Sequence, residues 1–111
     1  MLVGQSSPFG GKTRTRVLVA LRLLSESFPR ELARILGVSV NGVLQALKSL
    51  ELDGLVAGRS RGRTRIYRLN PRYFASPELQ SYLLRLAEAA PDLRQRVAEL
   101  RRRPRRAGKP L

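Results

Sequence analysis

Arginine side chains supply the most distinctive chemistry in this sequence. The chain has 19 Arg and 3 Lys, and its second half holds two dense groups of them. No acidic residue interrupts the first group, which is Arg59, Arg61, Arg63, Arg65 and Arg68. The second group, within residues 101–109, has five Arg and one Lys. A guanidinium group is a planar fork that pairs bidentately with phosphate or with guanine O6 and N7. These residues therefore predict a polyanionic partner.

The residue types that are missing exclude most catalytic and metal chemistry. With 22 basic residues, 8 acidic residues and no His, the formal net charge is +14, and the sequence has no Cys. Such a chain has no imidazole base, no thiolate nucleophile, no disulfide and none of the usual zinc or copper ligands. Eight carboxylates spread along the chain do not form an oxygen-rich metal cage. We expect no enzymatic activity, no metal and no cofactor.

The length and the apolar content indicate one small folded unit with appendages. The chain has 111 residues, of which 42% are hydrophobic, so it can build a single core. No apolar run approaches the ~20 residues of a membrane span, and we expect no secretory leader, because no basic stretch followed by an apolar segment is found at the start. We expect a cytoplasmic protein associated with the nucleoid and not with membranes.

Three helices are predicted ahead of the first arginine group. The first, over 13–25, is apolar on nearly every side and must be covered from more than one direction. A second subunit is the expected source of part of that cover. The second helix has Pro29 in its first turn, runs from Arg30 to Leu36, and ends at Gly37 as a left-handed residue. Ser39 is expected to cap the third helix, and Gly54 ends it.

Helical spacing divides the third helix, over 39–53, into a buried and an exposed side. The apolar stripe expected to be buried is Val40, Val43, Leu44, Leu47 and Leu50. Ser39, Asn41 and Gln45 should point outward, with Lys48 one turn further on. Asn and Gln read adenine N6 and N7 through paired hydrogen bonds. We therefore predict base contacts by Ser39, Asn41 and Gln45, and a phosphate contact by Lys48.

A basic hairpin follows the third helix. Residues 55–57 and 66–69 read as two strands, joined by a loop over 59–63 in which Gly62 supplies a positive φ. Arg61 and Arg63 flank Gly62 at the tip and are candidates for insertion into a narrow minor groove. Arg59 and Arg65 lie nearer the strands, where they suit phosphates.

The remaining sequence predicts two more helices between less ordered ends. Ser76 and Pro77 begin a fourth helix, and Pro91 begins a fifth that carries Leu93, Val97 and Leu100. The expected organisation is a flexible lead-in over 1–11, a DNA-binding domain over 12–70, C-terminal helices over 71–100 that cover the core or form a dimer seam, and a basic disordered tail over 101–111.

Helix, helix, glycine turn, helix and basic hairpin follow one another in the order of a winged helix-turn-helix. Gly37 lies four residues after the small Ala33, and Val43 lies six residues after Gly37. The chain resembles the winged-helix transcriptional regulators of the arsenical-repressor-like (ArsR) and MarR-like kind. The segments PRELA at 29–33, GVS at 37–39, LQAL at 44–47, LELDGLV at 50–56 and IYRL at 66–69 carry this resemblance, which covers about residues 13–70.

The resemblance implies a mainly α fold with a small β-hairpin: a three-helix core plus wing, followed by two C-terminal helices. It also implies a dimer whose third helix enters the major groove while the hairpin flanks it along the backbone or minor groove. Thr13 and Arg30 are further candidates for backbone contact, Arg30 because a helix N-terminus favours anions. Arsenical-repressor-type metal sensors keep a Cys pair in or near these helices, and residues 32–38 contain no Cys.

Together these observations predict a sequence-specific regulator that binds double-stranded DNA. A homodimer through the first and the C-terminal helices is expected to read an inverted repeat. An architectural or nucleoid protein that coats DNA without sequence preference is the alternative, and an RNA-binding winged helix would also fit the charge. An adaptor that recruits another protein through the last two helices stays open as a third role.

Overall fold

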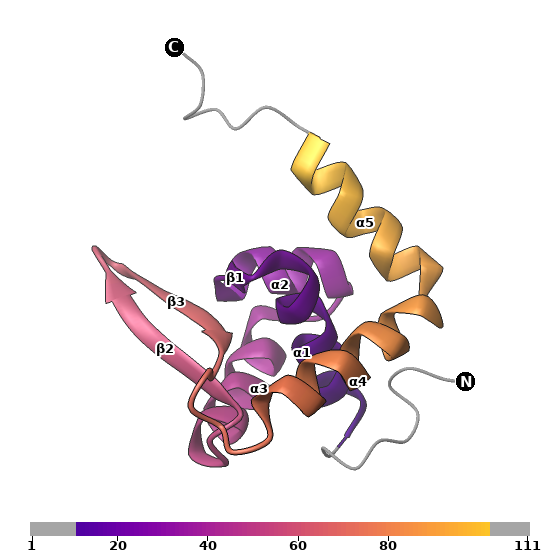
Figure 1. Cartoon of the computed structure of the whole chain (residues 1–111). Helices are drawn as coiled ribbons and strands as arrows, with labels where there is room; N and C mark the ends of the chain where they lie inside the picture. Colours follow the sequence, from indigo (N-terminus) through magenta and orange to yellow (C-terminus); the bar gives the residue numbers. More distant parts are fainter. Residues whose placement is uncertain (1–10, 103–111) are drawn as a thin grey trace.

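The computed structural model describes residues 11–102, which form five helices around a core and a small sheet that projects from it (Figure 1). The helices are α1 (Lys12–Leu24), α2 (Pro29–Leu36), α3 (Val40–Leu52), α4 (Ser76–Glu88) and α5 (Pro91–Arg102). The strands are β1 (Glu26–Ser27), β2 (Val56–Arg61) and β3 (Thr64–Leu69). The predicted lead-in over 1–11 lies outside the described residues except for Gly11.

Helix α1 forms the centre of the core. All five residues from Val17 to Leu21 are fully buried, in agreement with its apolar circumference. Its cover comes from the same chain, because α2, α3 and β3 pack on it and so do α4 and α5. The expectation that a second subunit covers α1 is therefore wrong. The two C-terminal helices occupy the side of α1 that the sequence left open (Figure 1).

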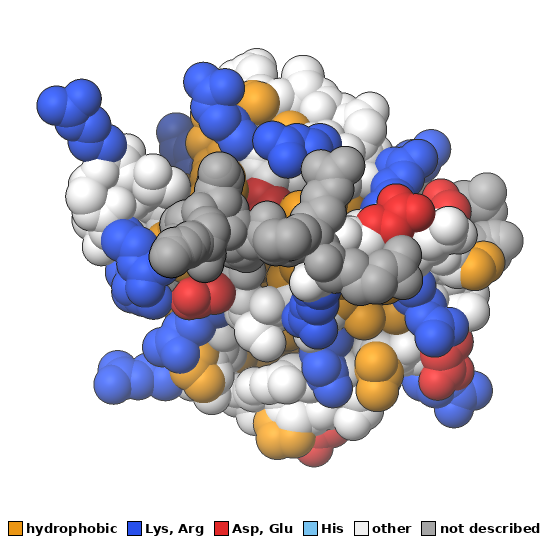
Figure 2. Space-filling view, turned by 90° about the horizontal axis from the view of Figure 1, so that it is seen from above, with side chains coloured by type: hydrophobic (Ala, Val, Ile, Leu, Met, Phe, Trp, Pro, Cys, Tyr) orange, Lys and Arg blue, Asp and Glu red, His pale blue; other side chains and the backbone are white. Residues whose placement is uncertain are grey.

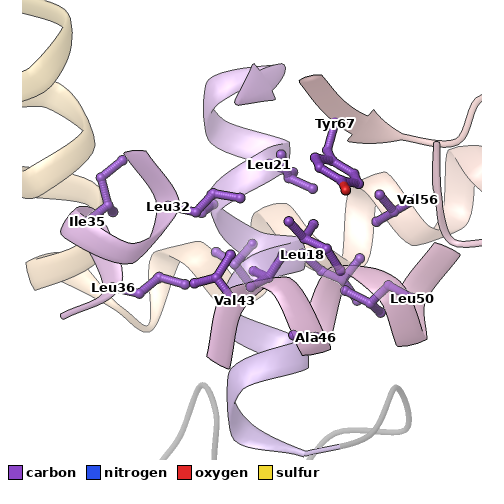
Figure 3. Close-up of a cluster of buried hydrophobic side chains, with 14 of the residues drawn as sticks. Leu18, Leu21, Leu32, Ile35, Leu36, Val43, Ala46, Leu50, Val56 and Tyr67 are labelled. Carbon is purple, nitrogen blue, oxygen red and sulfur yellow. The ribbon is translucent and has the colours of Figure 1, made fainter. Parts of the chain in front are cut away.

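The helix-turn-helix unit forms as the sequence predicts. Pro29 occupies the first turn of α2, and Gly37 ends that helix with φ 69°. The Gly37 N–H donates to the carbonyl of Ala33 at 2.9 Å, which closes the last turn. Val43 is fully buried and lies close to Leu36 and Leu32 in the core (Figure 3). Gly37 thus ends α2 as expected, and Ala33 and Val43 on either side of the turn are both buried.

Helix α3 is rotated relative to the stripe expected from its sequence. The residues that it buries are Val43, Ala46, Leu47 and Leu50. Val40 is 37% exposed and Leu44 is 42% exposed, so the prediction that these two belong to the core is wrong. Because α3 packs on both α1 and α2, its buried arc is centred between them, and the small Ala46 takes the place expected for Leu44.

The sheet is larger than the expected hairpin. Its strand order is β1-β3-β2 and both pairings are antiparallel; the two-residue strand β1 was not predicted. Pairing of β2 with β3 extends to Arg61 opposite Thr64, so only Gly62 and Arg63 form the turn. The expected loop over 59–63 is thus mostly strand. Gly62 has φ 62°, which a two-residue hairpin turn needs at its first position. We call residues 56–69 the wing.

The two C-terminal helices pack their apolar sides inward. Leu79, Leu83 and Ala87 of α4 and Leu93 and Val97 of α5 are buried. Helix α5 continues to Arg102, two residues further than expected, and the Arg101 guanidinium donates to the Leu23 carbonyl in α1. Arg101 therefore belongs to the folded unit and not to a tail. The rest of the predicted basic tail, residues 103–111, lies outside the described residues.

Candidate nucleic-acid interface

The outer face of α3 consists of the exposed residues Val40, Asn41, Leu44, Gln45 and Lys48. At about 3.6 residues per turn, these positions occupy one side of the helix, from Val40 at the edge of the buried stripe to Gln45, which lies opposite Val43 and Leu47. Asn41, Gln45 and Lys48 are exposed, as the sequence predicts. The face begins in the first turn of the helix, the part that enters a groove first in helix-turn-helix proteins.

Ser39 fixes the start of this face. Its hydroxyl oxygen accepts a hydrogen bond from the Gly42 N–H at 3.0 Å, so Ser39 is the predicted N-cap. A Cβ on Gly42 would lie 3.2 Å from the Ser39 hydroxyl oxygen, so glycine leaves room for the cap. The oxygen serves as acceptor within the helix, while the hydroxyl proton is free to be donated outward.

The arginines of the wing differ in how firmly they are held. Arg61 and Arg63 flank Gly62 and are exposed, and within residues 11–102 no ion pair or hydrogen bond engages either guanidinium. Arg59 pairs with Glu26 at 3.1 Å across the sheet, and both side chains are about half exposed. The tip therefore carries two free positive charges, and the middle of the wing carries one that a carboxylate partly offsets.

Arg65 is the most tightly positioned of the predicted wing residues. Its Nη2 donates to the Glu51 carboxylate at 2.7 Å, and its guanidinium lies 5.6 Å from the centre of the Tyr67 ring. The hydrogen bond and the charge of Glu51 raise the pKa of Arg65 above its ordinary value. A Cβ on Gly58 would come within 2.7 Å of Arg65 Nε, so glycine makes room for Arg65 to lie across β2.

The Arg65–Glu51 pair brings the wing next to α3. Glu51 is on α3 and Arg65 is on β3, and the start of β2 also packs against α3. Burial of Asn41 and Gln45, or a wing on another side of the molecule, would contradict the hypothesis of a DNA-binding surface. Neither is found, because both side chains are exposed and the wing adjoins the helix that carries them.

Two residues predicted to contact the DNA backbone lie on other elements, α1 and α2. Thr13, in the first turn of α1, is half-buried, whereas Arg30, in the first turn of α2, is exposed. The sequence reasoning missed Arg14, which links α1 to the end of α3. Its Nη2 lies 2.9 Å from the Asp53 carboxylate, and its Nη1 donates to Ser49. No local pattern predicts this pair, since Arg14 and Asp53 are far apart in the sequence.

Positive charge is distributed widely over the surface. Figure 2 shows Lys and Arg side chains around the rim of the visible face, with only a few acidic groups among them. Four ion pairs join described residues: Arg14–Asp53, Arg59–Glu26, Arg65–Glu51 and Arg85–Glu88. The large excess of arginine over carboxylate leaves most cations available to a polyanion.

Residues 11–102 contain no group of three His, Cys, Asp or Glu side chains placed to hold a metal ion. Within the same range, no helix combines the length and the apolar character that crossing a bilayer requires.

Solved structures similar to this chain share its architecture. It matches the adhesin competence repressor (AdcR) of Streptococcus pyogenes with a TM-score of 0.57 and 21% identity, covering 78% of this chain and 64% of that one. It matches one variant of ZitR from Lactococcus lactis with a TM-score of 0.60 and 20% identity over 85% of this chain and 64% of that one. A second ZitR variant matches with a TM-score of 0.61 and 20% identity, over 89% and 68%.

These likenesses establish the fold. The five helices and the small antiparallel sheet form a winged helix-turn-helix, as the sequence predicted. The chain spans 64% of the length of the first two of these proteins. No protein-family model matches the sequence, and no curated protein sequence does either.

Proposed function

From the winged helix-turn-helix fold, we propose that this protein is a transcriptional regulator that binds double-stranded DNA at specific sequences and has no enzymatic role. The outer face of α3 enters the major groove, where Asn41 and Gln45 contact base edges and Lys48 contacts a phosphate. Ser39 donates its hydroxyl proton to a base at the start of the helix. The wing lies along the backbone and minor groove, with Arg61 and Arg63 at its tip and Arg59 and Arg65 on phosphates.

The observation that carries this proposal is the position of the wing beside α3. The exposed start of α3 carries two amide side chains, and the Arg65–Glu51 pair joins the last turn of the same helix to a projecting strand pair with free arginines at its tip. An α-helix fits the major groove, and arginines suit the neighbouring phosphates and narrow minor grooves. The name of one structural neighbour, a competence repressor, points the same way. Arg30 and Thr13 complete the proposed backbone contacts.

We further propose that the protein acts as a homodimer in the cytoplasm, on nucleoid DNA. The apolar circumference of α1 does not support a dimer, because its apolar residues are covered by α4 and α5 of the same chain. We place the dimer contact on the C-terminal helices, where Tyr82 and Leu84, on different sides of α4, are 38% and 41% exposed. A symmetric dimer reads half-sites one helical turn, or a multiple of it, apart. Sedimentation as a monomer at micromolar concentration would exclude it.

Competition between a selected DNA sequence and bulk DNA tests the proposed function. Duplexes enriched by repeated binding from a random pool should win over unrelated genomic DNA by about 10³-fold or more at physiological salt. Equal binding of all duplexes would identify the architectural alternative, and preference for RNA would identify the RNA-binding one. If six to ten phosphates are contacted, affinity should fall about 10³–10⁵-fold between about 50 and 200 mM salt. A flat salt titration would contradict both DNA-binding functions.

A further inference from the structure

Two apolar side chains are exposed on the outer face of α3, although the sequence pattern assigns them to the core. Val40 and Leu44 are separated by one turn, so they form a short apolar strip on the surface of the helix. The core does not need them, because Val43, Ala46, Leu47 and Leu50 already fill the contact with α1 and α2. Their exposure therefore requires an explanation at the surface.

The strip lies on the side of α3 that faces the wing. Helical spacing aligns Val40 and Leu44 with Glu51, and Glu51 bonds Arg65 of β3 at 2.7 Å. Asn41, Gln45 and Lys48 border the strip on the side away from the core. Around the helix axis, the two apolar side chains thus lie between the predicted base-reading amides and the core, on the same side as Glu51 and about two to three turns before it.

The charges around the strip indicate which kind of partner it contacts. An apolar protein partner would gain nothing from the exposed cation Lys48 on the same helix face, or from the exposed cations Arg61 and Arg63 at the tip of the wing. The major groove of duplex DNA, in contrast, is lined by phosphates and presents one apolar group, the C5 methyl of thymine. A strip of two aliphatic side chains at the front of the helix matches methyl groups on the floor of a groove whose walls are anionic.

We propose that Val40 and Leu44 are specificity-determining residues that bind thymine C5 methyl groups in the major groove. This inference rests on the proposed function, since it needs α3 in that groove. It adds thymine recognition to the adenine recognition expected of Asn41 and Gln45. A site read by both kinds of contact has A·T pairs next to one another at the position of the α3 N-terminus.

Uracil substitution tests the proposal with a change of one methyl group. Duplexes selected by the full chain from a random pool are resynthesised with deoxyuridine in place of each thymidine in turn, which removes the C5 methyl and keeps the O4 acceptor. Burial of a methyl group predicts a loss of affinity of about threefold to fivefold at the one or two contacted thymines and none elsewhere. Full tolerance of uracil at every position would overturn the inference.

Variants connect the methyl effect to the named side chains. Leu44→Ala should bind thymine and uracil equally at one position, and Val40→Ala should do so at a second position. Leu52→Ala is the matched control, because Leu52 is 80% exposed on the same helix but at its far end; it should leave the discrimination unchanged. Far-UV circular dichroism confirms that each variant is folded. Discrimination that persists in both Leu44→Ala and Val40→Ala would contradict the assignment.

The outcomes separate this inference from the function on which it rests. If selection yields no preferred sequence, the proposed regulator is wrong and thymine recognition falls with it. If a preferred sequence emerges and tolerates uracil throughout, sequence-specific binding stands while the role of Val40 and Leu44 does not. If Leu44→Ala leaves DNA binding unchanged but dissociates a complex of the chain with itself, the strip is a protein interface.

Discussion

On the outer face of α3 a single residue, Lys48, is charged, whereas the wing beside it carries the five arginines Arg59, Arg61, Arg63, Arg65 and Arg68. The opposite side of α3 packs on the core, whereas the wing projects from the body as a pair of strands (Figure 1). Contacts to phosphates position a protein on DNA, and contacts to base edges specify the sequence. On the proposed function, the contrast predicts that the wing supplies affinity for DNA and that α3 supplies selectivity.

The two regions also differ in how their side chains are oriented. The start of α3 is fixed by the Ser39 cap, and its positions follow the rigid spacing of the helix. In the wing, Glu26 and Glu51 orient Arg59 and Arg65, but the arginines at the tip have no such partner among the described residues. A flexible cation can follow the backbone of many sequences, whereas discrimination between bases needs a fixed donor and acceptor.

Removing the charges at the tip of the wing should have the largest effect. The double variant Arg61→Gln with Arg63→Gln should weaken binding to every duplex by about 3 kcal/mol or more, since two charged hydrogen bonds are lost. The slope of log affinity against log salt should become shallower by about 2. Arg85→Gln with Arg94→Gln on α4 and α5 removes the same charge far from the wing; an equal loss there would remove the distinction between the two regions.

Truncating the amides of α3 should change selectivity and leave the salt dependence intact. Asn41→Ala and Gln45→Ala should each cost about 1–3 kcal/mol of discrimination at one base pair. Parallel selections with the wild-type chain and each variant would locate that base pair. Gln95→Ala on α5 serves as the neutral control. A uniform loss across all sequences would show that the amides contact the backbone instead.

Loss of the α3 cap should reduce stability by about 1 kcal/mol. Ser39→Ala removes the acceptor for the Gly42 N–H, whereas Ser39→Asn keeps a capping oxygen and should retain most of the stability. Urea unfolding measures both. If Ser39→Asn matches the wild type in stability but loses discrimination at a base, Ser39 contacts DNA as well as capping the helix. Equal stability of Ser39→Ala and the wild type would rule out the cap as a stabilising contact.

The smallest effect is expected from the pair that joins the two regions. Glu51→Gln removes a carboxylate near the proposed phosphate path and releases Arg65, so affinity should rise by less than about 1 kcal/mol at low salt. Glu88→Gln, which breaks the exposed pair with Arg85, is the matched control. A drop in affinity for Glu51→Gln would instead mean that the pair aligns the wing with α3.

Local signals in the sequence predicted the elements that such signals determine. Pro29, Gly37, Ser39 and Gly62 mark helix ends and a turn through their own dihedral angles or their nearest hydrogen bonds, and all four have the predicted roles. The exposure of Asn41, Gln45 and Lys48 follows from helical spacing. Whether these side chains contact DNA stays a prediction.

The features that the sequence does not predict are contacts between distant parts of the chain. Strand β1 has two residues and gains its identity only by pairing with β3, so its own sequence carries no strand pattern. The pairs Arg14–Asp53 and Arg65–Glu51 likewise need tertiary approach before they exist. The sequence predicts a phosphate contact for Arg65 but does not predict its bond to the Glu51 carboxylate.

The order of the helices, the turn between α2 and α3, the hairpin and the strong positive charge can be predicted from the sequence. These features depend on residue type and on neighbours within a few positions. The cover of α1 by α4 and α5 follows from the packing of the whole chain. The same is true of α3, which buries Ala46 while Val40 and Leu44 face outward. A helix with apolar residues on more than half of its circumference has several possible buried arcs. The summed packing of all elements selects one of them, and local spacing cannot.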